Sequence, residues 1–395
     1  MNKMLISIFT LTALLGTVSC SEIEDGVTDI DSWDDNQIEI YVPESFEHPG
    51  ILHTRADLTR LKEVVERKSG AAYQGYNEFM SDARSKSDYV MRGPYEEIHR
   101  GSYNGSSIQS NYENDWNAAY QNAVMYCVTG DESHARKSSE IINAYASHTK
   151  AIVGNDQPLL AGIMSVKFAY ACEVMHYMYP KGVSDADFEK VKSMFRKVFV
   201  PVLDTFMSTP AYSNGNWGAS VGMACTAAGI LLDDKEMYRK GIEFYLTGRD
   251  NGTIINYIDD NGQCQESGRD QAHAQLGIAC LSVTCELAEK QGMDLYSLYD
   301  NRLMKGFEYM SAYMCGKDVP FKQWKDVTGK YNNWSVISPD GRGNFRPVYQ
   351  MVYNHYVNRK HIPMPETEAA LRKIGVEGYY YEHFGFGTFL FNEAD

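Results

Sequence analysis

Apolar side chains recur at the spacing of an α-helix through most of the chain between residues 55 and 315. This periodicity predicts helices over residues 55–66, 72–87, 114–129, 133–148, 158–179, 184–207, 215–232, 234–247, 265–290 and 301–315. Alternating apolar and polar positions, which would indicate strands, are nearly absent, and turns rich in Gly, Asn and Asp separate the helices. The sequence therefore predicts an all-α array of helical hairpins.

Such an array must cover the apolar faces at its two ends. Closure into a ring covers both faces, so we expect a single-domain (α/α) toroid, or barrel, of six to seven helical hairpins. The ends of the inner helices and their connecting loops would shape one cleft. An open helical solenoid is the alternative, and the absence of a visible fixed-length repeat favours the ring.

The first residues of the chain have the pattern of a secretion signal. Residues 1–20 combine a basic start, an apolar run and small residues before Cys20, which resembles a bacterial lipoprotein cleavage site. The acidic run after Cys20 resembles the surface-export signal of Bacteroidetes lipoproteins. We therefore expect lipid on Cys20 and an anchor at the outer membrane, facing the cell surface or the periplasm. We expect residues 21–45 to form an acidic tether and residues 46–395 to form the toroid domain.

Composition narrows the choice of partner. A net charge of −15 argues against nucleic acid, because duplex binding needs a basic surface. The 28 tyrosines fit either a carbohydrate cleft or an aromatic core. The eight cysteines, apart from Cys20, lie mostly in apolar helical segments, which favours free thiols over disulfides.

Three irregular segments interrupt the helices, over residues 92–114, 212–218 and 316–346. The third alternates basic and aromatic residues. Cations can pair with the carboxylates of an anionic sugar polymer while aromatic rings stack on its sugars, so this loop is a candidate binding surface. The other interpretation is a solvated loop that covers the core.

The densest group of ionisable side chains lies in the stretch from residue 264 to residue 275. If this stretch begins a helix, Glu266, Arg269, Asp270 and His273 share one helix face. A charge on a buried face is costly unless it is paired. The four residues therefore form either a structural ion-pair cluster or the floor of a polar cleft.

The order of several short motifs resembles a known family. The motifs are His48-Pro-Gly-Ile-Leu, Asn214-Gly-Asn-Trp-Gly, Gly262-Gln-Cys-Gln-Glu-Ser-Gly-Arg-Asp-Gln-Ala-His and Phe384-Gly-Phe-Gly-Thr-Phe-Leu-Phe. Together they resemble the alginate lyase superfamily, most closely the (α/α)7-barrel polysaccharide lyases of gut Bacteroides, over residues 46–395. The resemblance implies a monomeric catalytic domain without a cofactor. It would cleave a polyuronate, with alginate as the first expectation, by β-elimination and leave a 4,5-unsaturated uronic acid end.

The resemblance assigns some site residues and leaves others open. Asn216 and Arg269 match the family's Asn and Arg, which implies that they neutralise the C6 carboxylate of the sugar. Trp217 stands where the family has a catalytic His, and Leu276 stands where it has a catalytic Tyr. The base and the acid must therefore come from elsewhere. The alternative role for Asn216 is that of a helix N-cap.

His273 is our first candidate for the base, because imidazole titrates near neutral pH. A structural histidine bonded to Asp270 or Glu266 is the alternative. Tyr331 is the first candidate for the acid, with Tyr212 and Tyr257 as alternatives. The residues that we expect to bind substrate are Trp217, Glu266, Gln271, Tyr212, Tyr257, Lys325, Trp334 and Arg342.

Other functions remain open at this point. The chain could be a lyase of glucuronan or another polyuronate. Glu266 and Asp270 could be the carboxylate pair of a toroid glycoside hydrolase. Asp270 and His273 could ligate a metal, although no further ligands are evident nearby, and we predict none. The non-enzymatic alternative is a surface lipoprotein that binds glycans.

Overall fold

The computed structural model describes residues 38–394. The predicted signal, the lipidation site Cys20 and most of the predicted tether lie outside the described residues. Residues 38–45 were predicted to end the tether, yet Ile38, Ile40 and Val42 pack against the core. The folded part of the chain therefore begins before residue 46.

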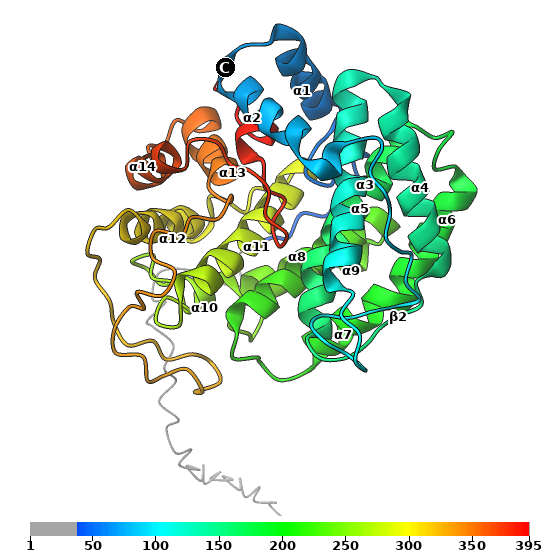
Figure 1. Cartoon of the computed structure of the whole chain (residues 1–395). Helices are drawn as coiled ribbons and strands as arrows, with labels where there is room; N and C mark the ends of the chain where they lie inside the picture. Colours follow the sequence, from blue (N-terminus) through cyan, green and yellow to red (C-terminus); the bar gives the residue numbers. More distant parts are fainter. Residues whose placement is uncertain (1–37, 395) are drawn as a thin grey trace, which may run out of the picture.

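Four long helices form an inner wall, and most of their side chains are buried. They are α3 (Gln109–Thr129), α5 (Gln157–Met178), α8 (Gly215–Leu232) and α11 (Gln271–Lys290). Each packs against the next in this order (Figure 1). Helices that are buried around most of their circumference must be covered on more than one side, so a second layer lies outside them.

The outer layer consists of amphipathic helices, each following its inner partner along the chain. They are α4 (Glu132–His148), α6 (Asp185–Met194) with α7 (Val200–Ser208), α9 (Lys235–Thr247) and α12 (Leu298–Met314). Each packs on the inner helix that precedes it. Within residues 38–394, one helix, α5, is long and apolar enough to cross a membrane, but it is almost wholly buried inside this arrangement.

The two ends of the chain close the ring. The elements that meet there are α1 (Arg55–Arg67), α2 (Gly70–Ser81), α13 (Gln350–Tyr353), α14 (Pro365–Ile374) and α15 (Gly387–Leu390). In Figure 1 the C-terminal segment lies against α2, and α1 packs on α3. A Cβ at Gly75 would lie 2.5 Å from the Phe389 backbone nitrogen, so only glycine allows this approach. The chain thus forms an (α/α) toroid, as predicted, and not an open solenoid.

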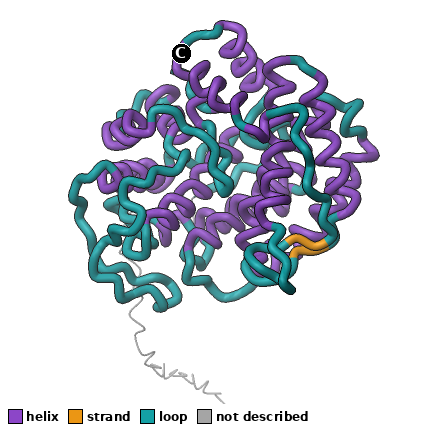
Figure 2. The backbone as a smooth tube through the Cα atoms, in the orientation of Figure 1, coloured by secondary structure: helices purple, strands orange, loops and turns teal. Residues whose placement is uncertain are grey.

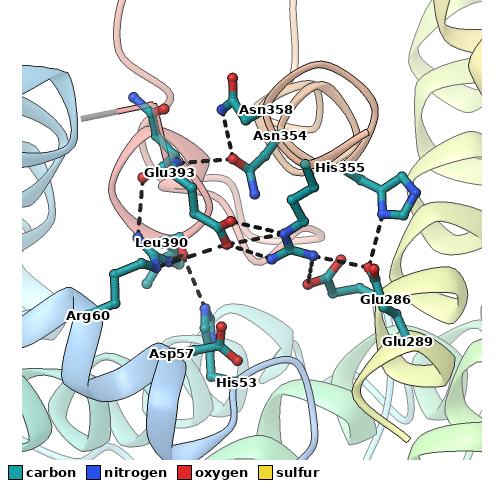
Figure 3. A network of polar contacts seen from close by, with 12 residues as sticks. His53, Asp57, Arg60, Glu286, Glu289, Asn354, His355, Asn358, Leu390 and Glu393 are labelled. Carbon is teal, nitrogen blue, oxygen red and sulfur yellow. Dashed lines mark hydrogen bonds and ion pairs between the residues drawn. The ribbon is translucent and has the colours of Figure 1, made fainter. Parts of the chain in front are cut away.

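Charged side chains fasten this closure (Figure 3). Arg359 donates to Glu393 near the C-terminus and to Glu286 and Glu289 at the end of α11. Arg60 on α1 donates to the carbonyl oxygens of Leu390 and Asn392. We call these residues the ring-closing network.

The structure departs from the predicted helices in several places. The predicted helix 184–207 is interrupted by a π-helical turn at Phe195–Phe199, next to Pro201, which cannot donate a backbone hydrogen bond. A short 3₁₀ turn, Ala83–Ser85, follows α2, and a four-residue helix, α10 (Ile254–Tyr257), precedes the turn to α11.

No helix was predicted beyond residue 315, yet α13, the π-helical turn Asn354–Arg359, α14 and α15 all lie there. Two short strands, β1 (Glu97–Ile98) and β2 (Ala151–Ile152), pair in parallel. Figure 2 shows this pair and the irregular chain between α12 and α13. The seven cysteines within residues 38–394 are all free thiols, as predicted, and five of them are buried.

Candidate active site

The stretch that leads into α11 is a series of tight turns and not the start of the helix. Helix α11 begins at Gln271, six residues later than predicted. Asp270 is its N-cap, with an extended backbone, and its Oδ1 accepts the backbone N–H of His273 at 2.8 Å. The predicted shared helix face is therefore wrong. The turns nevertheless bring the same four polar side chains together.

Glu266 is the hub of this group and is fully buried. Its carboxylate accepts the Asn216 backbone N–H at 3.0 Å and the Asn216 Nδ2 at 2.8 Å from both oxygens. It also accepts Arg269 Nη1 at 2.9 Å and the Tyr257 hydroxyl at 3.2 Å. Because the carboxylate faces the first turn of α8, the free N–H groups and the dipole of that helix stabilise it.

This arrangement corrects two expectations about Asn216. Helix α8 begins at Gly215 with Asn214 at the cap position, so Asn216 is not the N-cap. Its amide N–H groups face Glu266 and are not free to bind substrate. The side chain of Asn216 therefore fixes the position of Glu266.

His273 lies between Asp270 and Arg269. Its Nδ1 is 2.6 Å from Asp270 Oδ2, and its Nε2 is 3.1 Å from Arg269 Nη2. A guanidinium can only donate hydrogen bonds, so His273 Nε2 is the acceptor. The ring proton is then on Nδ1, which donates a hydrogen bond to Asp270. The result is a neutral imidazole whose Nε2 lone pair faces Arg269. The His273 side chain is 37% exposed, so a ligand can reach it.

The carboxyl of Asp270 is suited to orient this imidazole. Burial alone would raise the pKa of Asp270, but its hydrogen bonds from His273 and the nearby Arg269 lower it overall. The carboxylate form therefore persists at neutral pH and would stabilise a positive charge on His273. We refer to the linked side chains of Asp270, His273 and Arg269 as the Asp-His-Arg chain.

Two stacked aromatic pairs flank the Asp-His-Arg chain. Tyr212 stacks on Trp217 with ring centroids 4.6 Å apart, and Tyr331 stacks on Trp334 at 4.7 Å. Burial raises the pKa of Tyr212, and the neighbouring Tyr331 raises it further while Arg269 opposes the shift. The two tyrosines and Arg269 are therefore close enough to influence one another.

The second pair is positioned by a close approach to the turn before α11. A Cβ on Gly268 would lie 2.5 Å from the Cβ of Trp334, so this glycine lets the long loop settle directly over the turn. The irregular segment 316–346, between α12 and α13, thus packs its Trp334 against the turn that precedes α11. Its Lys325 is exposed to solvent.

A buried asparagine that the sequence analysis missed ties these loops together. The amide of Asn251 donates to the Tyr212 carbonyl at 2.9 Å and to Asp326 Oδ1 at 3.0 Å, and its oxygen accepts the Val327 N–H at 3.0 Å. Asp326 in turn accepts the N–H of Tyr331. The Asn251-Gly252 turn pair was the only sequence signal, and it indicates a turn and not a hub.

The neighbouring Asp250 holds the first loop from the other side. Its carboxylate accepts the Tyr212 N–H at 2.7 Å and the Gly252 N–H at 2.8 Å. Burial raises the pKa of Asp250 to about 6. The position of Tyr212 therefore depends on both Asp250 and Asn251.

Four of the predicted substrate contacts do not fit that role. Glu266, Tyr257 and Gln271 are buried, and their polar atoms bond within the protein. Arg342 donates to the carbonyls of Tyr313 and Lys317 and packs over the Tyr313 ring. These four side chains are therefore engaged in contacts within the protein. Within residues 38–394, no three His, Cys, Asp or Glu side chains are grouped so as to hold a metal ion.

A match to a protein-family model over most of the toroid decides the family of this chain. The family model for alginate lyase matches residues 64–320. The chain belongs to the alginate lyase family, a family of polysaccharide lyases. The matched stretch contains Asn216, Arg269 and His273, whereas Tyr331 and Trp334 lie beyond it. No curated protein matches the chain.

Solved structures of alginate lyases share the fold. Alginate lyase A1-III from Sphingomonas species A1 superposes with a TM-score of 0.64 at 14% identity, covering 89% of this chain and 98% of that one. A variant of A1-III complexed with a tetrasaccharide gives 0.62 at 15% identity, with the same coverage. An alginate lyase from Bacteroides ovatus gives 0.62 at 12% identity, covering 88% of this chain and 100% of that one.

Proposed function

We propose that this chain cleaves alginate by β-elimination and leaves a 4,5-unsaturated uronic acid at the new chain end. Membership of the alginate lyase family supports this substrate, and the tetrasaccharide complex of A1-III supports a polysaccharide substrate. The observation that carries the proposal is the Asp-His-Arg chain, which places a fixed cation beside the free lone pair of an imidazole.

The cation and the base would act in sequence. An entering C6 carboxylate is a stronger acceptor than a neutral imidazole, so it accepts the hydrogen bond that Arg269 Nη2 donates to His273 in its absence. This exchange neutralises the carboxylate, which makes the C5 proton more acidic, and it frees His273 Nε2 to remove that proton. Asp270 then stabilises the imidazolium through Nδ1, as a carboxylate does in other histidine-based sites.

The leaving oxygen needs a proton as the C4–O4 bond breaks. The electron pair of the C5–H bond forms the C4=C5 double bond, and the pair of the broken C4–O4 bond stays on O4. We propose Tyr331 as the acid that protonates O4, with Tyr212 as the alternative. The raised pKa of Tyr212 keeps its phenol protonated at neutral pH, which this role requires.

The geometry gives less support to a glycoside hydrolase. That chemistry needs two carboxyl groups that reach the glycosidic bond. Glu266 is fully buried and surrounded by donors from Asn216, Arg269 and Tyr257, so it cannot reach a substrate. Only Asp270 of the suspected pair would remain.

The test is to incubate the purified protein with alginate, glucuronan, hyaluronan and pectate and to follow the ultraviolet absorbance of a new C4=C5 bond. We expect absorbance to rise with alginate. A rise with glucuronan alone would assign the alternative polyuronate. Reducing ends without absorbance would indicate a hydrolase, and binding without either would indicate a glycan-binding protein.

Two variants test the assigned roles. Arg269→Ala should lower turnover about 100-fold or more, because it removes a positioned charge-stabilising donor. His273→Gln should lower turnover and remove the limb of the pH profile that belongs to the base. Arg372→Gln, an exposed arginine on α14, is the matched control and should behave as the parent. A fully active His273→Gln enzyme would assign the base to a tyrosine.

We also propose that the protein is held at the outer membrane by lipid on Cys20, because the preceding apolar run and the following acidic run match that type of signal. Cys20→Ala should move the protein from the membrane fraction to the soluble fraction. Recovery of the variant in the membrane fraction would contradict the proposal.

A further inference from the structure

A second cluster of charged side chains adjoins α11 just beyond the Asp-His-Arg chain. Glu382 pairs with two arginines, with Arg100 Nη2 at 3.2 Å and Arg346 Nη1 at 3.1 Å. The backbone N–H of Arg346 donates to Gln275 Oε1 on α11 at 2.8 Å. Gln275 is two residues after His273 in α11, which corresponds to about 3 Å along the helix axis. We call this group the Glu382 cluster.

The cluster carries more positive than negative charge. Besides the two arginines, the buried Lys167 donates to Asn117 Oδ1 at 3.0 Å and to the Tyr381 carbonyl at 2.7 Å. The second carboxyl, Glu113, is 4.0 Å from Arg100, and burial raises its pKa, which weakens its negative charge. Burial lowers the pKa of Lys167 to about 7, so part of its charge also remains.

Two further observations concern the donors and the charge of this cluster. Arg100 Nη1 is buried without a hydrogen-bond partner, although a guanidinium away from water normally uses its donors. The pKa of His383, which is 3.4 Å from Arg346, is lowered well below its usual value by burial and then by Arg346 and Lys167. Both features fit a site that receives an anion.

Aromatic rings and a cavity adjoin the charges. The Arg346 guanidinium lies over the Tyr380 ring at 4.7 Å, and Tyr381 stacks on Tyr380 at 5.0 Å while 37% of it is exposed. A cavity beside the cluster is lined by Lys167, Glu377, Glu382 and His383 together with mostly apolar residues, several of them on α5, α8 and α11. A sugar ring can stack on an exposed aromatic face while its carboxylate meets a guanidinium.

We propose that the Glu382 cluster is a second anion-binding subsite, at which Arg100 and Arg346 hold the carboxylate of a uronate unit next to the cleaved pair. Tyr381 would support the ring of the same unit. The inference rests on the proposed function, because it assumes that one polyuronate chain passes both Arg269 and Arg346. It assigns to this cluster a role in binding and none in the chemical step.

The test compares substrates of different length. Arg346→Gln and Tyr381→Ala should each raise KM for polymeric alginate about tenfold and leave kcat within about twofold, because a subsite outside the reacting centre contributes uniform binding. The shortest oligouronate that is still cleaved should show a smaller change in KM. Tyr381→Ala guards against misfolding, because its ring is partly exposed, and Arg372→Gln again serves as the control.

An unchanged KM for the polymer in both variants, with folding confirmed by circular dichroism, would overturn the subsite. Failure of the proposed function would give a different result: the parent protein itself would yield no ultraviolet-absorbing product from alginate. In that case the affinity of the parent and of Arg346→Gln for size-defined uronate oligosaccharides is measured by calorimetry. A weaker affinity in the variant would retain the anion site, whereas equal affinities would reject it.

Discussion

Asn216→Asp is the most revealing substitution at the candidate site. Sequence reasoning predicts that this variant folds as well as the parent and loses activity through repulsion of the substrate. The structure predicts a folding defect, because the new carboxylate would face Glu266 where the amide now donates at 2.8 Å to both oxygens. Both side chains are fully buried.

The size of the defect follows from the separation of the charges. Two carboxylates about 3 Å apart repel by about 6 kcal/mol at an effective dielectric constant of about 20. The pair relieves this repulsion by binding a proton. An Asp carboxyl in the unfolded chain titrates near pH 3.9, so a folded state that must keep this carboxyl protonated at pH 7 loses about 4 kcal/mol of stability. We therefore expect Asn216→Asp to lose about 4 kcal/mol of stability at pH 7.

The stability of Asn216→Asp should depend on pH in a way that identifies the cause of the loss. The folded variant binds one more proton than its unfolded state, so its stability rises as the pH falls, and the loss should shrink to about 1.5 kcal/mol at pH 5. Urea unfolding at both pH values measures this difference. Asn216→Ala loses the two hydrogen bonds without repulsion and should show no such recovery. A second change, Glu266→Gln, should restore much of the stability of Asn216→Asp. Parental stability of Asn216→Asp at pH 7 would refute the assigned contact.

Three further predictions concern the surrounding scaffold. Burial opposes charging of His48, but hydrogen bonds to Glu173 and Asp233 raise the pKa of His48 overall. The stability that charged His48 contributes is therefore complete below pH 6.5 and is lost as the pH rises through the pKa of the folded state. The melting temperature of the parent should fall over that window, and His48→Gln should flatten the change; an equally steep fall in the variant would contradict this. Asn251→Ala should reduce turnover at least tenfold with a stability loss of only about 1–3 kcal/mol, because it frees the loop that carries Tyr331; parental turnover would argue against it. Arg359→Gln should cost about 1.5–3 kcal/mol in urea unfolding, because it removes charge-assisted hydrogen bonds to Glu289 and Glu393, which then keep only His355 and Arg60 as charged partners; an effect no larger than that of Arg372→Gln would reject the role of the network.

Hydrophobic periodicity was sufficient to predict the toroid fold, but it did not locate the ends of all the helices. The inner helices α5 and α8 were predicted within one residue, since long apolar runs between turn signals leave little choice. Helix α11 was placed six residues too early, because polar turn residues next to a helix resemble its polar first turn. The deciding feature was Asp270, whose side chain caps the helix through a hydrogen bond that periodicity does not reveal.

The C-terminal helices were missed although one had a local signal. Helix α14 has Pro365 at its first position, acidic residues in its first turn and Arg372 and Lys373 in its last, which is the charge pattern of a helix. At the site, the side chains of Glu266, Arg269, Asp270 and His273 do lie together, but turns before α11 group them, and the helical spacing from which we predicted the group does not exist. The hub roles of Asn251 and Glu382 could not be predicted from the sequence, because their partners are distant in the chain.

Closure of the ring also constrains the order in which this protein can fold. Arg60 bonds to the carbonyl of Asn392, 332 residues further along the chain. Contacts of such high sequence separation form late, because the entropy of closing a long loop must first be overcome. The hairpins from α3 to α9 can pack while the rest of the chain is still being made, whereas α2 and the inner wall near Glu382 acquire their neighbours only when the last residues arrive. Chains that stop before residue 380 should therefore resemble an incomplete arc with exposed apolar edges, which makes them natural targets for chaperones and proteases.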